Sequence, residues 1–318
     1  MRFAFIVNPV SGQGHHDMDL LPEIDALIAG HPDEDIKTYT TLGVQDANVL
    51  ADAIATEAEE NGTDVVIFAC GGDGTIQETA NGVYGHDNAS LGVIPIGSGN
   101  DFVRQLIIDG GGIEDYLDLE KQLQGESKVI DLLRLSWSED GEEKSRLVAN
   151  GVNIGFDGNC AILASELKEL PIVSGTGAYM LSVLSNLIRK KGQNLHIVAD
   201  GEEFHEGPLL LATAGNGGYC GGGVRSCPNA DLSDGLIELM AIKNVQRMKF
   251  LKLFPAFKDG KILEAQGAKE LVTYKQSKDI MIEPLAADTM RFVADGEILE
   301  TGALHIETVP NAIKVWTV

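Results

Sequence analysis

The sequence contains little cysteine, few basic residues and no long uninterrupted apolar run. Its four cysteines form no CxxC pair and no Cys/His cluster at zinc-binding spacing, which is typical of free thiols in a reducing compartment. The 24 basic residues stand against 48 acids, giving a formal charge of −24, and this excess excludes a broad nucleic-acid-binding surface. We therefore expect a cytoplasmic protein that binds no nucleic acid.

Two apolar stretches decide whether a membrane segment is expected. The first, Phe3–Val7, is too short for the core of a secretory signal and is better explained as a buried strand. The second, Leu170–Ile188, carries no charge but is interrupted by proline, glycine, serine and asparagine. Its apolar residues recur at helical spacing from Tyr179 onward. We expect an amphipathic helix there and no transmembrane span.

The chain is long enough for two domains, with 318 residues of which 44% are hydrophobic. Up to Lys121, short apolar runs alternate with helical patterns, which predicts a parallel sheet flanked by helices. From Lys128 onward, strand-like segments separated by turns dominate, with helices near 159–168, 176–190 and 245–256. The predicted fold is an α/β domain with a parallel sheet over residues 1–124, then a mainly antiparallel β domain over 125–318. We expect its last strands to pack back on the first domain.

The predicted elements follow from these patterns. Those of the first domain are Phe3–Val7, Leu20–Ile28, Ile36–Tyr39, Ala47–Ala58, Val65–Ala69, Ile76–Val83 and Leu91–Ile94. The strands of the second are Val129–Trp137, Arg146–Ile154, Leu195–Ala199, Leu209–Ala214, Leu236–Ile242, Leu271–Tyr274, Ile280–Glu283, Met290–Val293 and Leu304–Glu307.

The most informative segment is "GGDGT" at 71–75, which lies between a buried strand and a helix. Such a turn brings free backbone N–H groups and a helix N-terminus to one point, where a phosphate can bind. The segment lacks the lysine of a P-loop and the spacing of a dinucleotide-binding motif. Asp73 would repel a phosphate, so it indicates a Mg²⁺ ion between the two groups. A tight turn with an exposed Asp is the alternative.

Two other strands of the predicted sheet end in similar turns. They are "IVNPVSGQG" at Ile6–Gly14 and "IPIGSGNDF" at Ile94–Phe102. Because the carboxyl ends of parallel strands meet at one edge, where open α/β sheets bind their ligands, we expect the three turns to form one site.

With a late "ADGE" at Ala294–Glu297, the motifs "NPVSG", "GGDGT" and "PIGSGND" resemble the diacylglycerol kinase catalytic family. The resemblance is to soluble bacterial lipid kinases, related to sphingosine kinases with an NAD-kinase-like fold, and covers nearly the whole chain. It implies a nucleotide-binding α/β domain and a β-rich lipid-binding domain, with the active site between them and ATP and Mg²⁺ as cofactors. The implied ATP-binding residues are Asn8, Ser11, Thr41, Gly71, Gly72, Asp73, Gly74, Thr75, Ile76, Gln77, Gly97, Ser98 and Asn100. The sequence departs from the family at Gln45, usually glycine, and at Ser98, often threonine.

The segment Cys227–Leu239 resembles the structural cation site of the same family. By that resemblance the Mg²⁺ ligands are Asp231, Asp234 and the backbone carbonyl of Leu236. Oxygen ligands suit a hard cation, and the short gap lets both carboxylates converge. A plain Asp-Gly turn is the alternative.

The resemblance places the acid–base chemistry at Asp295, with Glu297 as its partner. Phosphoryl transfer to an alcohol needs a carboxylate within reach of the hydroxyl group. Sphingosine kinases are often described with the base on the glycine-loop aspartate, so Asp73 is the other candidate. From the sequence alone, Asp295-Gly296 is equally well explained as a hairpin turn.

The sequence thus predicts an ATP-dependent lipid kinase of phospholipid metabolism that converts diacylglycerol to phosphatidate. NAD kinase, which shares "GGDGT", and a non-catalytic nucleotide- or lipid-binding regulator are the alternatives. Monoacylglycerol, phosphatidylglycerol, a sphingoid base or a polyprenol would suit the motifs as acceptor. Exposed sheet edges in the second domain are compatible with a homodimer.

A basic segment offers a route to the lipid, although the whole chain is acidic. Lys243–Lys261 contains six basic residues and one acid, together with Phe250, Phe254 and Phe257, and Arg189–Lys191 is a second basic run. We hypothesise that these segments dock transiently on a membrane surface by charge and apolar insertion. In the alternative interpretation they are ordinary helices with a buried apolar face.

Overall fold

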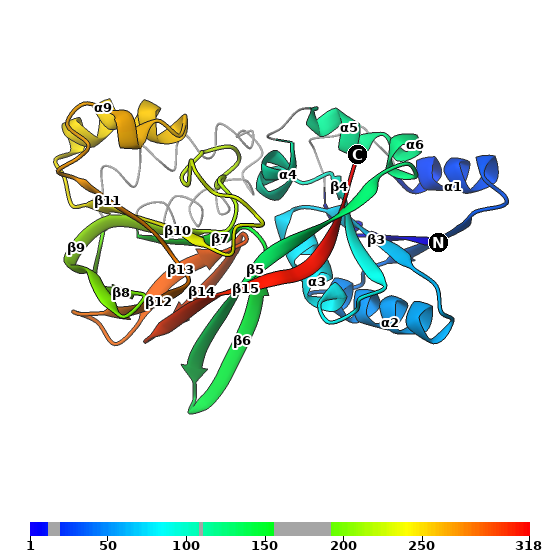
Figure 1. Cartoon of the computed structure of the whole chain (residues 1–318), viewed down its shortest axis with the longest axis horizontal. Coiled ribbons are helices and arrows are strands. Elements are labelled where there is room, and N and C mark those ends of the chain that lie inside the picture. Colours follow the sequence, from blue (N-terminus) through cyan, green and yellow to red (C-terminus); the bar gives the residue numbers. More distant parts are fainter. Residues whose placement is uncertain (12–19, 108–110, 156–191) are drawn as a thin grey trace. The chain divides into compact units, whose positions relative to one another are not determined.

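The computed structural model describes residues 1–11, 20–107, 111–155 and 192–318 (Figure 1). It divides into two compact units. Unit 1 comprises Met1–Asp131 and Pro310–Val318, and unit 2 comprises Leu132–Val309. The expected helices near 159–168 and 176–190, with the uncharged stretch Leu170–Ile188, lie outside the described residues.

Unit 1 contains the predicted parallel sheet. Its strands are β1 (Arg2–Val7), β2 (Asp35–Thr40), β3 (Val65–Gly71) and β4 (Ala89–Pro95). They lie in the order β4-β3-β1-β2, and each neighbouring pair is parallel. Every residue of β1, β3 and β4 is buried, as expected for parallel strands covered on both faces. The end of β15 (Leu304–Thr317) pairs in parallel with β4.

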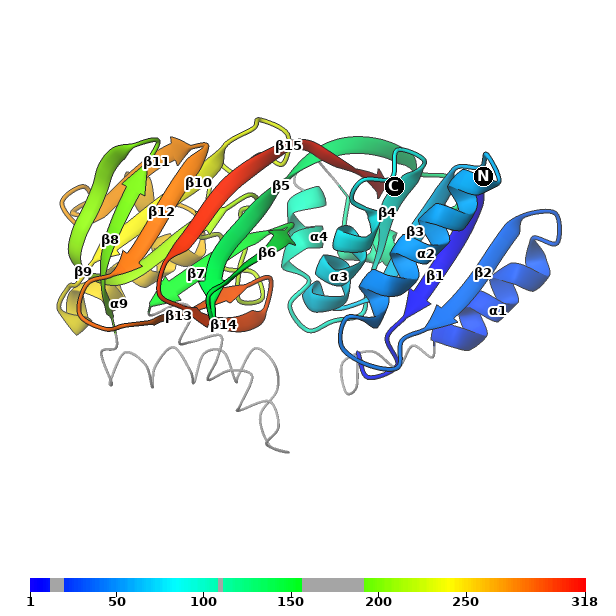
Figure 2. The same cartoon turned by 90° about the horizontal axis from the view of Figure 1, so that it is seen from below.

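The helices of unit 1 cover both faces of this sheet (Figure 2). They are α1 (Leu20–Gly30), α2 (Asp46–Glu60), α3 (Asp73–Val83), α4 (Asp101–Leu106), α5 (Ile113–Leu117) and α6 (Leu119–Gln122). Leu20, Ile24 and Leu27 of α1 pack with Phe3 and Phe5 of β1 in one apolar cluster. Helices α2 and α3 pack together and contact β3.

Unit 2 is mainly antiparallel β-structure. Its strands are β6 (Glu142–Val148), β7 (Gly151–Gly155), β8 (Gln193–Ala199), β9 (Glu202–Gly215), β10 (Ile237–Lys243), β11 (Val272–Ser277), β12 (Asp279–Pro284), β13 (Met290–Ala294) and β14 (Glu297–Thr301), with residues of β5 (Glu126–Glu139) and β15. The order β14-β13-β7-β9-β8-β12-β15 runs through the unit, and β10 and β11 branch from β9. Among the described residues, no helix of the chain is both long and apolar enough to span a membrane.

The fold class and most predicted elements are confirmed, with one clear error. The expected single strand Arg146–Ile154 is wrong, because β6 ends at Val148 and β7 begins at Gly151. Strand β14 and the short helices α5 and α6 were not predicted. The helix expected near 245–256 is present as α9 (Arg247–Lys258), followed by a 3₁₀ turn, η1 (Ile262–Glu264).

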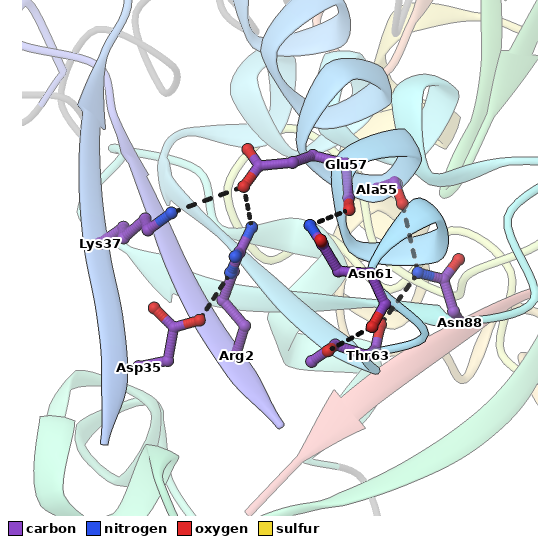
Figure 3. A network of polar contacts seen from close by, with 8 residues as sticks. All are labelled: Arg2, Asp35, Lys37, Ala55, Glu57, Asn61, Thr63 and Asn88. Atoms are coloured by element: carbon purple, nitrogen blue, oxygen red, sulfur yellow. Dashed lines mark hydrogen bonds and ion pairs between the residues drawn. The ribbon is translucent and has the colours of Figure 1, made fainter. Parts of the chain in front are cut away.

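A polar network closes the amino-terminal edge of the unit 1 sheet (Figure 3). Arg2 Nε donates to Asp35 Oδ2 and its Nη1 donates to Glu57 Oε1, both at 2.8 Å. The side chain of Arg2 is 9% exposed, whereas those of Asp35 and Glu57 are about half exposed. These contacts raise the pKa of Arg2, and the Arg2 hydrogen bond lowers the pKa of Glu57. The network therefore ties β1, β2 and α2 together.

Replacing Arg2 with methionine should lower the free energy of unfolding by about 2 kcal/mol. Both carboxylates would lose their main partner, and among the described residues only Lys37, at 3.6 Å from Glu57, would still pair with one of them. Urea denaturation measures the loss. Lys37→Met is the control, since an exposed ion pair contributes less than about 1 kcal/mol. Equal losses in the two variants would contradict the role given to Arg2.

Candidate functional site

The predicted nucleotide-binding residues lie along the carboxyl edge of the unit 1 sheet. Asn8 follows β1, Thr41 follows β2, Gly71 ends β3, and Gly97 lies two residues beyond β4. Since β1 lies between β2 and β3, and β3 lies beside β4, these four loops are neighbours in space. The sequence-based expectation that separate motifs meet at one edge therefore matches the topology.

Direct contacts join the first loop to the glycine loop. Asn8 Nδ2 donates to Thr75 Oγ1 at 3.0 Å, while Asn8 Oδ1 accepts the N–H of Val10 and its backbone carbonyl accepts the N–H of Ser11. The N–H of Thr41 donates to the carbonyl of Val7 at 3.0 Å. Asn8 thus fixes the positions of both loops relative to each other.

Two glycines of the phosphate loops are required by close packing, and a third, Gly74, is not. A Cβ on Gly71 would lie 2.3 Å from Thr75 Oγ1, and a Cβ on Gly97 would lie 2.4 Å from the Cα of Gly72. The loops after β3 and β4 are therefore in backbone contact. By contrast, a Cβ on Gly74 would meet nothing within 4 Å. Gly74 lies in the first turn of α3, where backbone N–H groups have no partner within the helix, and it faces open space.

Asp73 has a structural contact that the sequence did not reveal. Its Oδ1 accepts the N–H groups of Asp101 and Phe102, at 2.9 and 3.3 Å, at the start of α4. Burial raises the pKa of Asp73, against the lowering effect of these N–H groups. The carboxylate of the glycine loop therefore also holds the loop that follows β4.

The remaining predicted residues at this edge of the sheet differ in how exposed their side chains are. Thr75, Ile76 and Gln77 are buried in α3, and Ser98 is exposed. Asn100 is buried with a left-handed backbone, at φ 54°. Its Nδ2 donates to the carbonyl of Pro95, while its Oδ1 has no hydrogen-bond partner among the described residues. An acceptor left open in this way fits a ligand that carries N–H or O–H donors, as a nucleoside does.

In unit 2, Asp295 lies in the tight turn between β13 and β14 and has φ 44°. It is 7% exposed. Its Oδ2 accepts the N–H of Ala149 at 2.7 Å, and its Oδ1 accepts those of Asn150 and Gly151 at 3.1 and 2.9 Å. The residue is thus both a hairpin turn, as one interpretation predicted, and a buried carboxylate held by three amides.

These three amides explain why the predicted strand Arg146–Ile154 is interrupted. The backbone bends at Ala149 and Asn150 so that consecutive N–H groups converge on the Asp295 carboxylate instead of pairing with a strand. The bend is also held from the other side, because the N–H groups of Asn216 and Gly217 donate to the carbonyl of Asn150. Asn216 Nδ2 donates to the carbonyl of Ala149.

Glu297 lies two residues beyond Asp295, at the start of β14. Its carboxylate forms an ion pair with Arg146 of β6. Both side chains are partly exposed. The pair anchors the β13–β14 hairpin to the strand that precedes the bend.

The predicted cation turn holds its shape through its own hydrogen bonds. Asp231 Oδ1 accepts the N–H and the hydroxyl of Ser233, at 2.9 and 2.8 Å, and Asp234 Oδ1 accepts the N–H of Leu236 at 2.9 Å. Both carboxylates are exposed. The described residues contain no group of three or more His, Cys, Asp and Glu residues able to hold a metal. Two carboxylates and a carbonyl are ligands that suit a hard cation. Because the hydrogen bonds described here do not test this, the Mg²⁺ site stays a prediction.

Comparison with known proteins identifies the family. The diacylglycerol kinase catalytic domain matches residues 2–135, and the YegS C-terminal NAD kinase beta sandwich-like domain matches residues 150–317, more than half of the chain. The chain belongs to the diacylglycerol kinase family of the YegS type. As a member of this family it is a kinase.

Relatives match over most of the kinase chain. It is 29% identical over 315 residues to a diacylglycerol kinase of Mycobacterium tuberculosis (strain ATCC 25618 / H37Rv), covering 99% of this chain and 94% of that protein. It is 28% identical over 264 residues to lipid kinase YegS of Escherichia coli (strain K12), covering 81% and 79%. A crystal structure of a diacylglycerol kinase from Bacillus anthracis str. Sterne has a similar fold, with a TM-score of 0.65, 23% identity and coverage of 99% and 96%.

Sequence reasoning missed two buried asparagines of this YegS-type kinase, Asn150 and Asn216. Asn150 Nδ2 donates to the carbonyl of Tyr219 at 2.6 Å, so it connects the bend to the glycine-rich loop that follows β9. Each asparagine precedes a glycine. The Asn-Gly pair at 150–151 is a turn signal that could have predicted the break between β6 and β7.

A second buried carboxylate of the kinase, Glu238 of β10, lies behind the predicted cation turn. It is 1% exposed, and its Oε2 accepts the N–H of Asn229 at 2.9 Å. Its Oε1 has no hydrogen-bond partner among the described residues. Burial is the main cause that raises the pKa of Glu238 to about 7.

Stability should therefore fall as the pH rises through the range from about 4.5 to about 7. In that range Glu238 is protonated in the folded state and ionised in the unfolded state, so the folded state binds the extra proton. Glu238→Gln should remove the penalty and stabilise the protein by about 2 kcal/mol at pH 8, with little change at pH 4.5.

Urea denaturation at the two pH values, with EDTA present, measures this difference. Glu270→Gln, at an exposed position, is the matched control and should change stability at neither pH. A Glu238→Gln variant with wild-type stability at pH 8 would contradict the assignment.

Proposed function

We propose that the chain is an ATP-dependent lipid kinase that transfers the γ-phosphate to a lipid hydroxyl, with diacylglycerol as acceptor and phosphatidate as product. The family match along the chain carries this proposal. The name of the relative from Mycobacterium tuberculosis supports diacylglycerol as the acceptor.

The nucleotide is assigned to the carboxyl edge of the unit 1 sheet. The N–H groups at the start of α3 would bind phosphate oxygens near Gly74, where the backbone is open. Asn8, Thr75 and Asn100 would shape the loops around the nucleotide. Kinases of this type use ATP with a divalent cation, which neutralises charge on the transferred group. Oxygen donors at Asp73 and Asp101 suit such an ion, since both side chains flank Gly99.

Asp295 is assigned as the general base. It would accept the proton of the lipid hydroxyl while the new oxygen–phosphorus bond forms and the bond to the departing ADP breaks. The three amides fix the plane of its carboxylate. Asp73 is the other candidate, and its Oδ1 is likewise engaged by backbone N–H groups, at the start of α4. Glu297, paired with Arg146, would hold the hairpin that carries the base.

The test is transfer of labelled γ-phosphate from ATP to a panel of acceptors in mixed micelles with Mg²⁺. The panel contains diacylglycerol, monoacylglycerol, phosphatidylglycerol, a sphingoid base and a polyprenol, with NAD as control. Label in diacylglycerol supports the proposal. Label in another lipid corrects the acceptor, and label in NAD would overturn the lipid assignment. ATP binding without transfer to any acceptor would favour a regulator.

A further inference from the structure

The charge of the chain is unevenly distributed along its sequence. Lys243–Lys261 has six basic residues and one acid, which leaves 18 basic residues and 47 acids in the rest of the chain. A basic segment in so acidic a protein is a place that an anionic partner could approach.

The structure shows what this segment does with its apolar side chains. Phe250, Phe254 and Phe257 of α9 are buried. They pack in one cluster with Leu211 of β9 and Met240 of β10, and neighbouring rings lie about 6 Å apart. The expectation that these aromatic residues insert into a membrane is therefore wrong, because they anchor α9 to the sheet of unit 2.

The lysines of the segment are turned to solvent instead. Lys243, Lys249, Lys252, Lys258 and Lys261 are all exposed. Elsewhere in the chain, Lys121 and Lys144 pair with carboxylates, whereas none of the five forms an ion pair within the part of the chain that the structure describes. Their charges are thus available to a partner.

Hydrogen bonds within unit 2 connect the end of α9, which carries Lys258, to Asp295, the assigned base. The N–H of Arg225 donates to the carbonyl of Lys258 at 2.9 Å, so the end of α9 holds the glycine-rich loop. The same loop bonds the carbonyl of Asn150 through Gly217, and the N–H of Asn150 bonds Asp295. A short series of hydrogen-bonded backbone segments therefore leads from α9 to the assigned base.

We propose that the five exposed lysines of Lys243–Lys261 dock the protein on an anionic lipid surface by charge alone. This inference rests on the proposed lipid kinase function, since it states how the enzyme reaches a substrate embedded in a membrane. Each lysine near an anionic leaflet attracts it, and the attraction decays within a Debye length of about 10 Å at 0.1 M salt. Without apolar insertion the binding is weak and reversible.

The test is cosedimentation with vesicles of phosphatidylcholine, with and without phosphatidylglycerol. Wild-type protein should bind the anionic vesicles more tightly than the neutral ones, and high salt should release it. The double variant Lys249→Glu and Lys252→Glu should lose at least tenfold in vesicle affinity. Lys258 is left unchanged because its carbonyl holds the glycine-rich loop.

The matched control is Lys128→Glu with Lys278→Glu, which changes the net charge equally at two exposed positions outside the segment. It should bind within twofold of wild type. Three results would each overturn the proposal. Wild type could bind anionic vesicles no better than neutral ones, the double variant could bind like wild type, or the control could lose as much vesicle affinity as the double variant. Phosphorylation of a dispersed short-chain diacylglycerol is measured in parallel. The rate should be the same in the Lys249 and Lys252 variant as in wild type. If wild type does not phosphorylate this soluble acceptor, the proposed lipid kinase function is contradicted, and not the docking surface.

Discussion

Replacing Asp295 with asparagine should lower kcat for lipid phosphorylation by about 10²–10⁴-fold and leave the Kd for ATP within about twofold of wild type. Asparagine keeps the size of the side chain but cannot take the hydroxyl proton. ATP binding is assigned to unit 1, whereas Asp295 lies in unit 2. The measurements are initial rates in mixed micelles and ATP titration by calorimetry.

The same substitution also carries a structural cost that needs its own control. An amide NH₂ would face a backbone N–H that now donates to the carboxylate, which costs about 1–3 kcal/mol of stability. Asp200 offers a matched site, since it also has a positive φ, precedes a glycine and accepts the N–H groups of Lys278 and Asp279.

Asp200→Asn keeps an oxygen for both N–H groups, since each donates to Oδ1, and loses only the charge opposite Lys275, so it should leave catalysis unchanged. Asp200 is exposed and lies in the turn between β8 and β9. If both variants retained activity, Asp295 would be a structural turn residue only. If both lost activity to the same extent, the loss would come from weakened turns and not from a missing base.

Gly74→Ala should weaken ATP binding at least tenfold while it raises the free energy of unfolding by up to about 1 kcal/mol. The added methyl group enters space that is empty in the protein, at a helical position where alanine is favoured over glycine. It would keep a phosphate from approaching the N–H groups at the start of α3. Opposite signs for stability and affinity are the signature of a ligand at this point.

Two other glycines separate this effect from a damaged loop. Gly97→Ala would force a Cβ to 2.4 Å from the Cα of Gly72 and should cost stability as well as ATP binding. Gly30→Ala, also in open space but at the end of α1, should leave ATP binding unchanged and should not lower the free energy of unfolding. Wild-type ATP affinity in Gly74→Ala would contradict the assigned phosphate position.

The sequence predicted the elements of the fold well because their signals are local. The buried runs of β1, β3 and β4 and the amphipathic pattern of α2 are written in consecutive residues. Strand ends of a parallel sheet converge by topology, so the sequence alone could place Asn8 and Gly71 at one edge. The order of strands in unit 2 has no such local signal.

The contacts around the two aspartates could not be predicted, since they join residues far apart in sequence. Of the Asp-Gly pairs that the structure describes, those at 140–141, 200–201 and 295–296 have a positive φ at the aspartate. Only burial and three amide donors from the β6–β7 bend distinguish Asp295 from the other two. Asn-Gly likewise occurs at the break at 150–151 and inside helix α3 at 81–82, so it marks a bend only in context.

The basic helix shows the same limit in another form. Its composition suited both a membrane-inserting helix and a packed one, because a helix with aromatic residues at spacing i, i+4 and i+7 has one apolar face in either case. Phe250, Phe254 and Phe257 pack against β9 and β10, so α9 is the packed helix of the two alternatives. The homodimer and the Mg²⁺ turn stay predictions.

The central claim is that a lipid hydroxyl receives the γ-phosphate of ATP. Its most direct test gives the wild-type protein one mixture of ATP, Mg²⁺, diacylglycerol in mixed micelles and NAD, and quantifies all phosphorylated products and ADP. The account predicts phosphatidate in a one-to-one ratio with ADP and no phosphorylated NAD. Phosphorylated NAD, or ADP formed without phosphatidate, would contradict it.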